Sequence, residues 1–252
     1  MNFNINIFIS FFVLSFSSNA FALTAAGVLD KLYKYCMPSV SADALTEEEK
    51  SEIKIYDHRK KTNIFAQVDD YIKNSKLGIS VFAEDLKIKE ALKPYKNITE
   101  KIINRQTACK NDVLMFFDYP CDDDVLTNLK QAICATSIHY MNYQNYKADE
   151  ESILKAFASM IRYCCNNLEG NFSLIRGASA LGLTEEVIET LLDVYEECGM
   201  IKIDSRDSDS YKIHFESGVE FSKALHTPKY AEFVELLNTI NDYKNKFMTI
   251  DL

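Results

Sequence analysis

The chain has 252 residues, of which 47% are hydrophobic and 26% charged, so it is long enough to bury a core and has an ordinary globular composition. Its formal net charge of −9 at pH 7 argues against general nucleic-acid binding, which depends on Lys and Arg neutralising phosphates. Its seven cysteines form no Cys-x-x-Cys pair, which favours reduced thiols over a disulfide framework or a zinc site.

Residues 1–22 form an apolar leader. Ile7–Phe16 carries no charge, and Ala20-Phe21-Ala22 matches the cleavage pattern of a secretory signal. No Lys or Arg precedes the apolar segment, and it is too short to cross a bilayer as a helix. It is therefore either a signal peptide, with a mature chain starting near Leu23, or a buried segment or misassigned gene start. An N-terminal helix and a polar linker are predicted for residues 23–52.

Residues 53–145 are predicted to form an α/β domain, a small parallel sheet flanked by helices. Its central strand is the unbroken apolar run Val113–Phe117, which is typical of a strand buried on both faces. Asp122–Asp124 then supply the N-cap of a helix. Further strands are predicted at Ile53–Tyr56, Ile79–Phe82 and Ser137–Met141, and a helical piece at Ile98–Ile103.

Residues 146–252 are predicted to form a winged-helix domain with a C-terminal helix. Three amphipathic helices are followed by two strands and one more helix; the ranges are 149–168, 173–181, 184–198, 200–203, 211–215 and 227–247. The third helix would read DNA in such a module, but it carries six carboxylates and no Lys or Arg. These charges would repel phosphates, so direct DNA reading is disfavoured.

The carboxyl ends of the predicted strands gather Asp57, His58, Asp118 and Tyr119, where parallel α/β sheets usually bind ligands. Asp57 and Asp118 beside a histidine could serve acid–base catalysis. The favoured interpretation is instead a surface network, formed by Asp57 with Arg59 or by Asp118, together with helix caps. The sequence contains no Gly-rich phosphate loop and no nucleophile elbow, and we assign no catalytic residue, metal ligand or cofactor.

Arg59, Lys60 and Lys61 form the densest basic cluster of the chain. Beside an apolar groove, these side chains could hold an acidic, hydrophobic peptide of a protein partner. The alternative is that they are the solvated start of a helix. The sequence leaves both interpretations open.

Several stretches resemble the C-terminal domain of RecJ-type single-stranded-DNA-specific exonucleases of the Firmicute type. The resemblance extends from about Ile53 to Leu237 and rests on the pattern of strand, proline, helix and predicted winged helix. It is carried by IYDHRKKTNIF, GISVFAEDL, DVLMFFDYPCDDDVLTNLKQAICATSIHYMNY, EESILKAFASMIRYCCNN, FSLIRGASALGLTEEVIETLLDVYEECGMIKI and KALHTPKYAEFVELL.

The resemblance implies a non-catalytic accessory domain of a cytoplasmic DNA repair exonuclease. The nuclease core of the family uses Mn²⁺ or Mg²⁺ at an aspartate-rich site with a DHH signature, and Asp57-His58-Arg59 lacks the second histidine. The implied partners are an exonuclease core or a single-stranded-DNA-binding protein. The alternatives are an exported binding or scaffold protein with the same fold, or a small α/β enzyme acting at Asp57 and Asp118.

Overall fold

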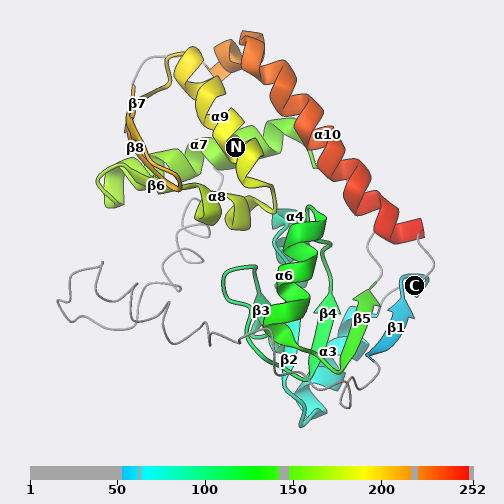
Figure 1. The fold of residues 1–252 in the computed structure, drawn as a ribbon. Coiled ribbons are helices and arrows are strands. Elements are labelled where there is room, and N and C mark those ends of the chain that lie inside the picture. The colour runs from blue at the N-terminus through cyan, green and yellow to red at the C-terminus, as the bar shows by residue number, and fades with distance from the viewer. Residues whose placement is uncertain (1–52, 62–63, 142–147, 217–220, 250–252) are drawn as a thin grey trace, which may run out of the picture. The chain divides into compact units, whose positions relative to one another are not determined.

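The computed structural model describes residues 53–61, 64–141, 148–216 and 221–249, and Figure 1 shows their arrangement. Residues Ser51–Leu252 belong to one compact unit. The predicted leader at 1–22 and the predicted helix and linker at 23–52 lie outside the described residues. Among the helices of the described part, none is both long and apolar enough to cross a membrane.

A five-stranded parallel sheet forms the first half of this unit, in the order β1-β5-β4-β2-β3. The strands are β1 Lys54–His58, β2 Ile79–Phe82, β3 Ile102–Ile103, β4 Val113–Phe116 and β5 Ser137–Met141. All residues of β4 are buried, and β4 lies between β5 and β2, which confirms the predicted central strand. The predicted α/β fold class is therefore confirmed.

Helices cover both faces of the sheet. Helices α3 Phe65–Asn74, α4 Leu86–Leu92 and α5 Lys96–Thr99 contribute to the apolar cluster on one face, and α6 Asp123–Ile133 packs on the other. Asp122 accepts a hydrogen bond from Val125 N at 2.7 Å, which confirms the predicted cap of α6. Asp85 caps α4 in the same way through Ile88 N at 2.9 Å.

The predicted helix at Ile98–Ile103 is wrong for its last residues. The helix α5 stops at Thr99, and Ile102–Ile103 forms β3 beside β2. The reason is tertiary, because Val81 N and Ala83 N of the β2 segment donate to Lys101 O and Ile103 O at 2.9 and 3.3 Å. Two β-branched residues fit such a ladder, and pairing with β2 outweighs the local helical pattern.

The second half contains helices α7 Glu150–Asn167, α8 Leu174–Leu181 and α9 Glu185–Glu197 beside a three-stranded antiparallel sheet in the order β6-β8-β7. The strands are β6 Asn171–Ser173, β7 Ile201–Arg206 and β8 Ser210–Phe215, followed by η1 Phe221–His226 and α10 Pro228–Thr249. The sequence analysis missed β6, which is too short for a visible alternation. This element order is compatible with a winged helix, and that finer assignment stays a prediction.

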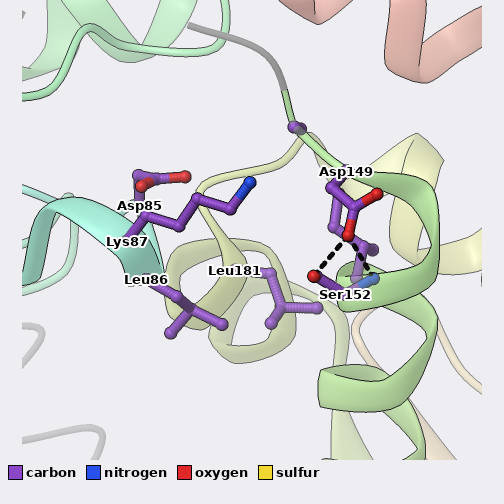
Figure 2. Close-up of a pocket in the computed structure, with 8 residues that line it drawn as sticks. Asp85, Leu86, Lys87, Asp149, Ser152 and Leu181 are labelled. Carbon is purple, nitrogen blue, oxygen red and sulfur yellow. Dashed lines mark hydrogen bonds between the residues drawn. The ribbon is translucent and has the colours of Figure 1, made fainter. Parts of the chain in front are cut away.

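The starts of α4 and α7 and the end of α8 enclose a small hollow (Figure 2). Its wall includes Lys87, Leu181 and Asp149, whose carboxylate accepts hydrogen bonds from the backbone and hydroxyl of Ser152. The cavity holds about 40 Å³, close to the volume of one or two water molecules. Ligand pockets for organic molecules are roughly ten times larger, so this hollow is no candidate for one.

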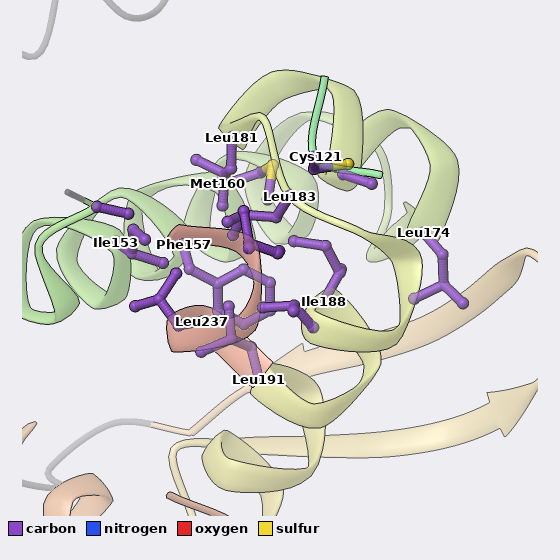
Figure 3. Packing of buried hydrophobic residues seen from close by; sticks show 14 of the residues in the cluster. Cys121, Ile153, Phe157, Met160, Leu174, Leu181, Leu183, Ile188, Leu191 and Leu237 are labelled. Atoms are coloured by element: carbon purple, nitrogen blue, oxygen red, sulfur yellow. The ribbon is translucent and has the colours of Figure 1, made fainter. Parts of the chain in front are cut away.

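The main hydrophobic core includes residues of both the parallel sheet and the helical half. Figure 3 shows its part around Phe157 and Leu191. Phe157 of α7 is fully buried, and its ring meets those of Phe172 and Tyr195 edge-on at centroid distances of 5.8 and 5.1 Å. The same cluster includes Leu114 of β4 and Leu237 of α10. One core cluster therefore contains residues from both of the predicted domains, 53–145 and 146–252.

Candidate functional site

The carboxyl ends of β2 and β4 mark the topological switch point of the parallel sheet. The chain leaves β2 toward β3 on one side, and it leaves β4 toward β5 on the other. Ligands of such folds bind in the crevice between the two departing loops. In this chain the loops bring together Glu84 and Asp85 after β2, Asp118 after β4 and Arg105 after β3.

Asp118 and Lys244 form a buried ion pair at this position. The Lys244 Nζ atom of α10 donates to Asp118 Oδ1 at 2.9 Å, and both side chains are only 1% exposed. The second carboxylate oxygen accepts from the backbone N–H groups of Glu84 at 3.1 Å and Asp85 at 2.8 Å. The Asp118 carboxylate after β4 is therefore hydrogen-bonded both to the backbone after β2 and to α10, a helix near the C-terminal end of the chain.

Glu84 and Arg105 form a second ion pair in the same crevice. The Arg105 side chain donates to both Glu84 carboxylate oxygens at 2.5 to 3.0 Å, and its backbone N–H adds a bond at 2.8 Å. Glu84 Oε1 also accepts the hydroxyl of Ser179 on α8 at 3.1 Å. Burial disfavours the charge of Arg105, but the hydrogen bonds and charge of Glu84 outweigh this effect and raise its pKa.

Three nearby groups have shifted pKa values because this region is screened from water. Burial, followed by the charge of Asp118, raises the pKa of Asp85. Burial lowers the pKa of the Lys89 amine despite the carboxylates around it. Burial also raises the pKa of the Cys121 thiol to about 12, which keeps the thiol protonated and unreactive at neutral pH.

The predicted strand-end residues divide between this crevice and the neighbouring edge of the sheet. Asp118 lies in the crevice, whereas Asp57 pairs with Arg59 through bonds of 2.8 and 2.9 Å. The hydrogen bonds from Arg59 lower the pKa of Asp57 to about 2. Tyr119 donates to Met141 O at 3.2 Å, so it is held by β5. The structure thus provides separate cationic partners for the two aspartates. Asp57 is exposed, as expected for a surface network, whereas Asp118 is buried and not at the surface.

The end of α10 covers this edge of the sheet. The Phe247 ring stacks on Tyr119 at a centroid distance of 5.2 Å, and Arg59 Nη1 donates to the Phe247 carbonyl. Together with Lys244 one turn earlier, these contacts place the C-terminal helix over the strand ends that would otherwise open toward a ligand.

His58 and Tyr56 of β1 form an aromatic cluster with His139 of the neighbouring strand β5. His58 Nε2 and His139 Nδ1 are 3.2 Å apart, a hydrogen-bonding distance. The Tyr56 ring stacks on His139 at 4.5 Å. Burial lowers the pKa of both imidazoles, and that of His139 falls to about 4. At neutral pH the two rings are therefore uncharged.

This pair predicts a loss of stability in mild acid. The folded state favours neutral His139, whose pKa of about 4 lies below the usual value near 6.5 in an unfolded chain. Stability is then complete above pH 6.5 and decreases as the pH falls from 6.5 toward 4. We expect a loss on the order of 1 kcal/mol, allowing for solvent screening of a half-buried ring.

Urea unfolding at pH 7 and pH 5 measures this effect. The variant His139→Gln should show a smaller decrease between the two values than the parent protein. The matched control is His226→Gln, at an exposed site of η1, which should leave the decrease unchanged. Equal pH dependence in the parent protein and in His139→Gln would contradict the assignment.

The predicted basic cluster lies at the end of β1. Arg59 is held by Asp57 and Phe247, and Lys60 and Lys61 lie at exposed positions after it. The cluster therefore presents positive charge beside an edge strand.

The acidic face of α9 forms ion pairs and a hydrogen bond with the antiparallel sheet. Arg206 of β7 bonds Asp193 at 2.8 Å and Glu196 at 2.6 Å, and the Tyr211 hydroxyl donates to Glu189 at 2.7 Å. α9 also packs along α10. Contacts within the chain therefore occupy much of the polar face that would have to enter a DNA groove.

The sequence analysis missed four residues of the crevice: Glu84, Asp85, Arg105 and Lys244. Glu84 and Asp85 come just after the predicted strand Ile79–Phe82. Their position at the carboxyl end of the sheet could therefore have been predicted from the sequence. Lys244 continues the apolar stripe of Leu237 and Ile240 at helical spacing, which indicates a buried cation. Within the described residues, no group of three or more His, Cys, Asp or Glu is arranged to hold a metal ion.

Comparison with known proteins gives no relative for this chain, because no protein-family model, curated protein or solved structure matches it. The resemblance to RecJ-type C-terminal domains stays a prediction. The function is therefore inferred from the arrangement of the residues.

Proposed function

We propose that this chain is a non-catalytic docking module, similar in role to the C-terminal domain of a RecJ-type exonuclease in cytoplasmic DNA repair and recombination. The main support is the buried pair of Asp118 and Lys244. In a catalytic α/β domain, the switch point presents charged groups to a ligand. Here those groups neutralise one another, and α10 covers them.

The contacts around Glu84 and Asp118 favour a structural role over acid–base catalysis. A general acid or base must lie within hydrogen-bond reach of the proton that it transfers. Asp118 already accepts three hydrogen bonds, and Glu84 bonds Arg105 and Ser179. A substrate would have to displace Lys244 of α10 before it could reach the Asp118 carboxylate, and Arg105 and Ser179 before it could reach that of Glu84.

The charge distribution favours a protein partner over nucleic acid. The net charge is −9, and the polar face of α9 is acidic and held by Arg206 and Tyr211. Phosphate binding would require a basic surface of several Lys and Arg residues. The partner expected from the resemblance is an exonuclease core or a single-stranded-DNA-binding protein.

Two measurements test this function. The purified chain should bind a RecJ-type catalytic core from which the C-terminal domain has been removed, with a dissociation constant in the micromolar range or tighter. Alone, it should leave single-stranded DNA intact in the presence of Mn²⁺. Digestion that is stimulated by Mn²⁺ and abolished by Asp57→Ala would overturn the proposal in favour of an enzyme, and failure to bind the core would overturn the docking role.

A further inference from the structure

The two edges of the parallel sheet differ in length and exposure. At one edge β3 has two residues, and both are half-buried. At the other edge β1 has five residues, of which four are exposed. A long exposed edge strand is a template for pairing with another chain, and proteins usually shorten or cover it. The β1 edge is therefore the unusual feature.

The backbone of β1 has hydrogen-bonding groups that point away from the sheet. Lys54 N donates to Thr136 O at 3.0 Å, so the N–H of Lys54 faces β5. Along a strand in a parallel ladder, successive residues turn alternately to the two sides. The N–H and C=O groups of Ile55 and Asp57 therefore point outward, where β1 is the outermost strand of the described sheet.

Apolar side chains lie along this edge, which pairs with no other strand than β5 in the described part of the chain. Ile53, Ile55 and Tyr56 are 48%, 51% and 43% exposed, although they flank a buried sheet. Ile53 and Ile55 share one face, and Lys54 and Tyr56 share the other. An added strand would bury apolar surface on the first face and meet a positive charge on the second.

The charge at this edge is positive in a chain that is negative as a whole. Lys54 lies on β1, and Lys60 and Lys61 follow it, all with exposed side chains. The nearby carboxylate of Asp57 is engaged by Arg59. The local field therefore favours an acidic occupant and disfavours a second copy of this edge, which would bring the lysines of both copies together.

We propose that β1 binds an extended acidic segment of a protein partner, which adds to the sheet as a sixth strand. The backbone N–H and C=O groups of this segment would pair with the outward N–H and C=O groups of Ile55 and Asp57. Its apolar side chains would lie beside Ile53 and Ile55, and its acidic side chains beside Lys54 and Lys60. This inference rests on the proposed docking function and specifies the surface and the chemistry of the segment that it receives.

The test uses the full chain and a labelled decapeptide in which Asp or Glu alternates with Val or Phe. Fluorescence anisotropy should show saturable binding, weakened at least tenfold when the acidic residues are replaced with Lys. The peptide should lose binding when alternate backbone amides are N-methylated, since methylation blocks strand pairing. Hydrogen exchange at Ile55 and Asp57 should slow when the unmodified peptide is added.

Two protein variants separate backbone pairing from charge. Ile55→Pro removes an outward N–H group without removing a ladder donor, and it should abolish binding. Lys54→Glu combined with Lys60→Glu should weaken binding at least tenfold at low salt and less at high salt. Circular dichroism and urea unfolding establish that both variants are folded, and the double charge variant tests the site even if Ile55→Pro is destabilised.

Several outcomes would overturn the inference. One is slow exchange at Ile55 in the dilute full chain without peptide, which would mean that a segment of the chain itself occupies the edge. Another is a dimer that Ile55→Pro dissociates, which would identify a second copy as the occupant. Equal binding of the acidic and basic peptides would also contradict it. If Ile55→Pro loses the peptide but still binds the catalytic core, the docking function stands and only this surface is wrong.

Discussion

Replacing Lys244 with methionine should lower the free energy of unfolding by about 3 to 5 kcal/mol, the usual cost of leaving one charge of a buried pair without its partner. Methionine keeps most of the volume of the side chain and removes the cation. Asp118 would then remain 1% exposed, with its two backbone bonds to Glu84 and Asp85 but without a counter-charge. The loss should appear as a lower urea midpoint with an unchanged slope.

The control for this change is Lys246→Met, two residues further along α10. That side chain is exposed, and an interaction of an exposed charge contributes at most about 1 kcal/mol, so its replacement should change the stability by less than about 1 kcal/mol. The double variant Asp118→Asn with Lys244→Met should be more stable than the sum of the single effects predicts, because no unpaired charge remains. Equal effects of Lys244→Met and Lys246→Met would show that the pair does not hold α10 to the sheet.

The pairing of α10 with the switch point also limits what could be predicted from the sequence. Val113–Phe117 is a continuous apolar run, and its strand, its helix cap at Asp122 and the α/β class follow from local patterns alone. Lys244 is 126 residues from Asp118, and no local rule places these two residues together. The partners of a long-range ion pair depend on how the two halves dock.

The strand β3 shows the same limit at smaller scale. Ile102 and Ile103 follow a helical segment closely, and two residues are too few to show a period of two. Only the presence of β2 beside them decides their conformation. In the crevice, Asp118 was identified from its place after a predicted strand, but its cation Lys244 was missed. Neither residue of the Glu84–Arg105 pair was identified.

The edge strand β1 is a further case in which the sequence pattern predicts the element but not its exposure. The apolar residues Ile53, Ile55 and Tyr56 predict a strand correctly, but the same pattern would suit a buried one. Their exposure follows from the order of the sheet, in which β1 pairs only with β5 among the described strands. The most informative residues for docking therefore look like core residues in the sequence.

Glu84→Gln should lower the free energy of unfolding by about 2 to 4 kcal/mol, the range for removing the charge of a buried, hydrogen-bonded ion pair. Glutamine has nearly the same shape as glutamate, so the packing stays. Its amide nitrogen, however, would face the Arg105 donors that now bond the carboxylate at 2.5 to 3.0 Å. One donor group would be left without an acceptor in a buried site, and Arg105 would lose its counter-charge.

The control for Glu84→Gln is Glu90→Gln, which alters an exposed pair with Lys93 and should cost less than about 0.5 kcal/mol. Ser179→Ala should cost about 1 kcal/mol, since it removes one neutral donor from the same carboxylate. The backbone N–H of Glu84 bonds the Asp118 carboxylate, so Glu84→Gln and Lys244→Met should not be additive. Strict additivity would mean that the two ion pairs are independent, and the crevice could then open at one pair while the other keeps the sheet and helices together.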